Sequence, residues 1–141
     1  MDQRISLITL GVADVSASRA FYQRIGWKES SISNEHVAFF QVGGMIFSLY
    51  GREHLAADAK QPAEGTGFSG FALAHNVASK AKVDAVLAEA EAAGAKILAP
   101  AEEKFWGGYS GYFADPDDHA WEIAWNPGFD LKEDGRIFLP Q

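Results

Sequence analysis

The same order of segments occurs twice in this chain, and that repetition limits the folds open to it. Each half opens with an apolar, β-prone run, continues with a segment of helical periodicity and closes with short strand patterns, giving the order βαβββ. One such half is too small to bury its apolar face well, so we expect the halves to pack together. The expected segments are strand 5–12, helix 17–25 and strands 27–31, 36–42 and 45–50, then strand 68–75, a helix after Ser79 and strands 95–98, 109–113 and 120–125.

Capping residues mark the ends of both predicted helices. Asp14 or Ser16 is placed to accept a hydrogen bond from the first turn of the first helix, and Gly26 suits its C-terminal end. Ser79 opens the second helix and Gly94 stops it. These signals agree with the hydrophobic periodicity, which strengthens the prediction of one helix in each half.

The predicted organisation is a single domain, 1–141, of the α+β class. We expect two βαβββ modules that form a curved mixed sheet around a cavity, the first over about 4–50 and the second over about 68–126. The segment 51–67 reads as a polar linker with a short helix at 52–60. The tail, 127–141, contains turn signals and should cover the surface rather than extend the sheet.

Composition excludes several classes of function. The chain has no cysteine, which excludes disulfides and thiolate metal sites and favours a cytoplasmic protein. Its net charge of −7, without a basic patch, disfavours nucleic acid as a partner. No apolar run approaches the roughly 20 residues that span a bilayer, so a membrane partner is not expected. A neutral or cationic small molecule is the more natural ligand.

Two motifs carry a resemblance to a known family, and they stand in the order that the duplicated pattern requires. The motifs are Leu10-Gly11-Val12-Ala13-Asp14 leading into Phe21-Tyr22 and Gly26-Trp27, and Tyr112-Phe113-Ala114-Asp115-Pro116 leading into Trp121-Glu122-Ile123. With them the chain resembles the vicinal oxygen chelate superfamily, which includes glyoxalases, bleomycin-resistance proteins and extradiol dioxygenases, over about residues 4–126.

The resemblance implies a place for a divalent metal, but the residues there are degenerate. In metal-dependent members, four side chains on the concave sheet face hold the ion. Register places Leu7, Ser48, Gly70 and Glu122 at those positions, and only Glu122 is a competent ligand. We therefore expect no cofactor and disfavour a metal. The four histidines are expected to be surface or turn residues: His36, His54, His75 and His119.

Strand alternation groups the remaining candidate residues. The face that carries Glu122 should also carry Ser48 and Tyr50 in a mostly apolar cavity, where Glu122 acts as a general acid or base or binds a cationic group. Tyr112 resembles the tyrosine of the extradiol dioxygenase signature. Gly111 and Asp118 depart from that signature and no upstream histidine is present, so a dioxygenase is less expected. Further ligand-stacking candidates are Trp106, Tyr109 and Trp125.

Three functions remain open from the sequence. The leading prediction is a metal-independent protein that binds a small aromatic or cationic molecule, comparable to the bleomycin-resistance proteins. The second is a glyoxalase-like lyase or isomerase with Glu122 as base or residual metal ligand. The third is a non-catalytic dimeric scaffold with a relict site. Exposed edge strands make a homodimer the expected assembly in each case.

Overall fold

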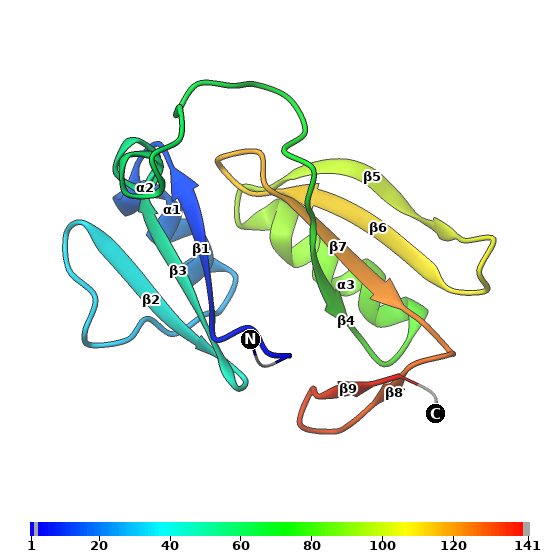
Figure 1. The fold of residues 1–141 in the computed structure, drawn as a ribbon. Helices are drawn as coiled ribbons and strands as arrows, with labels where there is room; N and C mark the ends of the chain where they lie inside the picture. The colour runs from blue at the N-terminus through cyan, green and yellow to red at the C-terminus, as the bar shows by residue number, and fades with distance from the viewer. Residues whose placement is uncertain (2, 140–141) are drawn as a thin grey trace. The chain divides into compact units, whose positions relative to one another are not determined.

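The chain folds into two compact units, each with its own sheet. A computed structural model describes residues 1 and 3–139, and its units are Met1–Gly67 and Phe68–Gln141 (Figure 1). The α+β class and the open, curved mixed sheets expected from the duplicated pattern are confirmed.

The first unit combines a three-stranded sheet with two helices. In the sheet order β1-β3-β2, β1 runs parallel to β3 and β2 runs antiparallel to it. The short helix expected in the linker is present as α2. The elements are β1 (Leu7–Val12), α1 (Val15–Arg24), β2 (Val37–Val42), β3 (Met45–Gly51) and α2 (Arg52–Ala59).

The prediction of a strand at 27–31 was wrong. Only one isolated bridge forms there, between Glu29 and Phe40. Side chains in the following turn take hydrogen bonds that a strand ladder would need. The Ser33 hydroxyl accepts from the amide of Phe39 at 2.9 Å, and the Asn34 side chain accepts from the amide of Val37 at 3.1 Å. Such local side-chain bonds compete with regular sheet pairing.

The cap predictions for the helices are confirmed. Asp14 is the N-cap of α1, and its side chain accepts from the amide of Ala17 at 3.0 Å. Gly26 follows the helix with φ of +95°, a conformation that glycine adopts without strain. In the second unit Ser79 caps α3 (Lys80–Ala92) by accepting from the amide of Lys82 at 3.2 Å.

One face of the first sheet packs on α1 and forms the core of this unit. Aromatic rings dominate the contact: Tyr22 lies 4.9 Å from Phe47 and 5.2 Å from Trp27, measured between ring centroids. Trp27 also meets Phe47 edge-on at 5.0 Å. The buried strand residues on this face are Leu10, Val12, Ala38, Phe40, Phe47 and Leu49. The opposite face is therefore left free of α1, and α2 contacts β1 and β3 there.

The second unit is a four-stranded sheet covered on one face by α3 (Figure 1). Its order is β4-β7-β6-β5, with β4 parallel to β7 and the other pairs antiparallel. The tail does not extend this sheet, as expected, and forms a separate two-stranded hairpin. The elements are β4 (Leu73–Asn76), β5 (Lys96–Glu103), β6 (Tyr109–Ala114), β7 (Ala120–Trp125), β8 (Asp130–Leu131) and β9 (Ile137–Phe138).

The strand predicted at 68–75 begins later than expected, because β4 starts at Leu73. Gly70 has φ of +85°, a left-handed conformation that interrupts an extended chain. Phe68 and Phe71 are exposed on this irregular segment. The position that the resemblance assigned to Gly70 therefore lies outside the sheet.

None of the helices in the part of the chain that the structure describes has the length and apolar character needed to cross a lipid bilayer.

Candidate functional site

The free face of the first sheet carries the residues that sequence alternation had grouped. Thr9 pairs with Ser48 across β1 and β3, and Ser48 pairs with Phe39 across β3 and β2. Side chains two residues along share the same face, which adds Leu7 and Tyr50. The predicted positions Leu7, Ser48 and Tyr50 thus lie together on one surface.

A cavity of about 470 Å³ lies over this face and is closed on one side by α2. Its walls combine apolar and aromatic side chains with hydroxyls at the base and a carboxylate, an amide and an imidazole among its lining residues. Those residues are Leu7, Thr9, Asn34, His36, Val37, Phe39, Ser48, Tyr50, Leu55 and Asp58. The size and composition are typical of a small-molecule site.

Two hydroxyls form the polar base of the cavity. The Thr9 and Ser48 hydroxyl oxygens lie 2.6 Å apart, so one donates to the other. Ser48 is only 1% exposed, which holds this pair in fixed positions. Since each hydroxyl has one proton and two lone pairs, the bonded pair retains one donor proton and acceptor lone pairs for a ligand.

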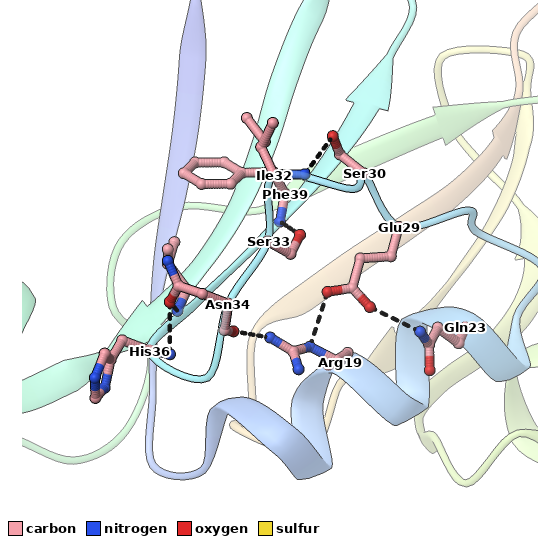
Figure 2. A network of polar contacts seen from close by, with 10 residues as sticks. Arg19, Gln23, Glu29, Ser30, Ile32, Ser33, Asn34, His36 and Phe39 are labelled. Atoms are coloured by element: carbon pink, nitrogen blue, oxygen red, sulfur yellow. Dashed lines mark hydrogen bonds and ion pairs between the residues drawn. The ribbon is translucent and has the colours of Figure 1, made fainter.

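The segment that supplies Asn34 and His36 is anchored on α1 by a polar network (Figure 2). Arg19 pairs with Glu29 at 3.1 Å and also donates to the carbonyl oxygen of Asn34. Gln23 donates to the other oxygen of Glu29 at 2.9 Å. The Asn34 side chain in turn accepts from the amide of His36 at 2.8 Å. These contacts position the cavity rim and were not visible as a sequence motif.

On the second sheet, Tyr112 and Glu122 are directly opposite each other on β6 and β7, on the face away from α3. Burial raises the pKa of Tyr112, and the charge of Glu122 and a hydrogen bond to it raise it further, while the Lys104 ammonium acts in the opposite direction. The phenol therefore donates to the carboxylate as a neutral group. The structure pairs Glu122, the predicted general acid or base, with Tyr112, the candidate that resembles the dioxygenase tyrosine.

The predicted stacking aromatics are placed elsewhere. Tyr109 and Trp125 pair across β6 and β7 on the helix-covered face, opposite to that of Glu122. Tyr109 donates to Asp84 of α3 at 2.9 Å, and the Lys80 ammonium lies 5.4 Å from the Trp125 ring centroid. Trp106 lies in the β5–β6 loop, where its ring packs against Gly108. Tyr109 and Tyr112 are three residues apart on β6, and an odd offset places two side chains on opposite faces of a strand. The sequence therefore already indicated this separation.

One of the four histidines lies in the interior. His119 ends the Asp-rich turn, as expected of a turn residue, but it is buried, with 9% of its surface exposed. Its ring nitrogen Nδ1 lies 2.9 Å from Oδ2 of Asp115. The carboxylate and the ring satisfy each other in the interior, so His119 serves the fold of this turn. His36, His54 and His75 are exposed.

Comparison with known proteins identifies the family. Residues 4–123 match the model of the Glyoxalase/Bleomycin resistance protein/Dioxygenase superfamily. The chain belongs to this superfamily. Among solved structures, a glyoxalase-related enzyme from Fulvimarina pelagi is 35% identical to this superfamily member. The match covers 98% of this chain and 99% of the Fulvimarina pelagi chain, with a TM-score of 0.89.

Two further structures have the same fold. A glyoxalase/bleomycin resistance protein/dioxygenase family enzyme from Burkholderia phytofirmans PsJN is 26% identical, with 85% of this chain and 96% of that chain covered and a TM-score of 0.74. A lactoylglutathione lyase from Agrobacterium tumefaciens is 24% identical, with 89% and 96% covered and a TM-score of 0.67, a likeness of fold alone. No curated protein matches the sequence.

The residues at the four superfamily metal positions do not fit a divalent ion. Leu7 has no donor atom, the Ser48 hydroxyl is engaged with Thr9, and Gly70 has no side chain and lies outside β4. Only Glu122 carries a charged oxygen ligand. Within residues 1 and 3–139, no group of three or more histidine, aspartate or glutamate side chains is arranged to hold a metal ion.

Proposed function

We propose that this superfamily member binds a small aromatic or cationic molecule, without a metal, in the cavity of the first unit. The observation that carries the proposal is the cavity of about 470 Å³ on the free sheet face. Phe39 and Tyr50 supply aromatic surface for stacking. Asp58 is the carboxylate among the lining residues, and together with the Tyr50 ring it favours a cation.

The polar base of the cavity supports a ligand with one hydrogen-bonding group at its inner end. The Thr9–Ser48 hydrogen bond is part-buried and Ser48 is buried, so a ligand group that reaches the pair forms its hydrogen bond largely away from water. A buried site that matches one polar group discriminates strongly against analogues lacking it. An aromatic amine with a small polar substituent has the corresponding chemistry.

A thermal-shift screen in the presence of EDTA tests this proposal. Aromatic amines should raise the melting temperature of the wild-type protein, because a ligand that binds only the folded state stabilises it. Tyr50→Ala should weaken the dissociation constant of the best amine by about tenfold, the loss expected for one ring that stacks on a cation. Isothermal titration calorimetry gives that constant.

Tyr109→Ala is the matched control, because Tyr109 lies in the second unit and does not line the cavity. It should leave the dissociation constant unchanged. If divalent ions raised the melting temperature in a parallel screen without EDTA and no amine did so in either screen, the proposed function would be abandoned.

A second candidate function is a lyase or isomerase of the glyoxalase type with Glu122 as a metal-free base. The pairing of Tyr112 with Glu122 favours it, because a neutral phenol beside a carboxylate provides a proton donor and a proton acceptor on one face. Lactoylglutathione, the compound in the name of the Agrobacterium tumefaciens relative, is the first substrate to test.

Glu122→Gln should reduce such turnover by about a hundredfold or more, because glutamine cannot accept the proton. The same change should lower the pKa of Tyr112, since the carboxylate charge that helps to raise it is removed. Absorbance at alkaline pH, compared with Tyr112→Phe, measures that pKa and shows that the contact exists in solution. Full turnover in Glu122→Gln excludes the base role.

A further inference from the structure

A buried hydroxyl on the second sheet has no hydrogen-bond partner. Ser110 of β6 is 0% exposed, and its Oγ contacts no donor or acceptor among the described residues. Ser110 pairs with Ala124 on β7, two residues from the Tyr112–Glu122 pair, and so lies on the same face as both. An orphaned buried hydroxyl is uncommon in folded proteins and requires an explanation.

We propose that Ser110 and Glu122 together recognise an amino alcohol, with the ligand hydroxyl on Ser110 and the ligand ammonium on Glu122. This inference goes beyond the proposed ligand binding in the first-unit cavity, because both residues belong to the second unit and neither lines that cavity. The ligand supplies the hydrogen-bond partner that the fold does not give to Ser110.

The spacing of the two residues fits a ligand whose polar groups are on neighbouring atoms. Ser110 and Glu122 are diagonal neighbours on adjacent antiparallel strands, for which the separation is about 7–8 Å. A two-carbon spacer with a hydrogen bond of about 2.8 Å at each end has a length comparable to that backbone separation. The residues on either side of Glu122 on the same face of β7 are Ala120 and Ala124, which have only methyl side chains.

The charges on this face favour a cationic ligand. Lys104 and Glu102 form an ion pair at 2.8 Å, so their charges offset each other. Glu122 lies directly opposite Tyr112, whose raised pKa keeps the phenol neutral. An ammonium group supplies the opposite charge and donates to the carboxylate, a stronger interaction than a bond between two neutral groups.

One cross-strand neighbour of Ser110 is an exposed charged residue. Ser110 pairs with Glu102 on β5 and with Ala124 on β7. The Glu102 side chain is 70% exposed, and it forms an ion pair with Lys104 at the surface. Exposed ion pairs of this kind are weak, so a ligand that approaches Ser110 can displace the Glu102 side chain at little cost.

A ligand role predicts opposite effects of Ser110→Ala on stability and on binding. Removal of an unpartnered buried hydroxyl should raise the melting temperature by roughly 3–6 °C. Ser18→Ala is the matched control, since the Ser18 hydroxyl in α1 is also buried without a partner. It should raise the melting temperature similarly and leave binding unchanged.

Calorimetry with three probes tests the proposal: phenylethanolamine, phenethylamine, which lacks the hydroxyl, and phenylethanol, which lacks the amine. Wild type should bind phenylethanolamine about fivefold more tightly than phenethylamine, as expected for one hydrogen bond. Ser110→Ala should remove that difference by weakening only the amino alcohol. Glu122→Gln should weaken both amines by about tenfold. Phenylethanol should bind weakly to every variant.

The Tyr50→Ala variant keeps this proposal separate from the proposed function. Its first-unit cavity is impaired, so amino-alcohol binding that persists there and is lost in Ser110→Ala supports the second-unit site. Binding that is lost in Tyr50→Ala and retained in Ser110→Ala overturns this inference and leaves the proposed function standing. Equal behaviour of Ser110→Ala and Ser18→Ala towards all probes, or no binding of any probe, also overturns it.

Discussion

Gly111→Ala should lower the free energy of unfolding of the second unit by about 3 kcal/mol, because β5 passes too close for a side chain. A Cβ at this position would lie 2.7 Å from Cδ1 of Leu87, 2.8 Å from the nitrogen of Ala101 and 2.9 Å from the oxygen of Ala99. Two of these atoms belong to the backbone and cannot rotate away. Urea denaturation measures the change.

The approach of β5 has a structural origin. The pairing of β5 with β6 shifts register between Ala99 and Glu102, and this irregularity brings the β5 backbone towards Gly111. Gly44→Ala is the control, since a Cβ there meets nothing within 4 Å. It should change stability by less than about 0.5 kcal/mol. Equal stability of the two variants would show that β5 does not pack as described.

Asp115→Ala should also lower the free energy of unfolding by about 3 kcal/mol, because several buried donors lose their acceptor together. Oδ1 of Asp115 accepts from the amides of Asp117 and His119, each at 2.9 Å, and both carboxylate oxygens contact Nδ1 of His119. Chemical denaturation at neutral pH measures the loss.

Asp134→Ala provides the comparison for Asp115→Ala. Asp134 makes a similar turn contact, with Oδ1 accepting from the amide of Arg136 at 3.1 Å, but its side chain is exposed to solvent. Water replaces that bond, so the change should cost less than about 1 kcal/mol. A loss for Asp115→Ala no larger than for Asp134→Ala would contradict the buried role of the Asp115–His119 pair.

Much of the fold followed from local chemistry in the sequence. Asp14, Gly26 and Ser79 specify helix ends through short-range hydrogen bonds and backbone preference, which depend little on the rest of the chain. The shared face of Ser48 and Tyr50 followed from strand alternation alone. Both kinds of inference need only neighbours in sequence.

The remaining differences arise from interactions between distant segments. The β5 backbone that explains Gly111 approaches from another strand, and the side chains that end sheet pairing near Glu29 belong to a turn whose position is set by Arg19 of α1. Asn34, His36 and Asp58 reach the cavity from a loop and a helix, and no local pattern indicates that. Ser110, by contrast, lies two residues from Tyr112, and alternation alone places both on one face.

The most direct test of metal-independent binding is calorimetry of the best aromatic amine before and after exhaustive EDTA treatment, on wild type and on Tyr50→Ala. Binding in the first-unit cavity predicts the same dissociation constant with and without EDTA, and a constant about tenfold weaker in Tyr50→Ala. Loss of binding after EDTA, restored by added divalent metal, or equal affinity of the two proteins, would contradict the account.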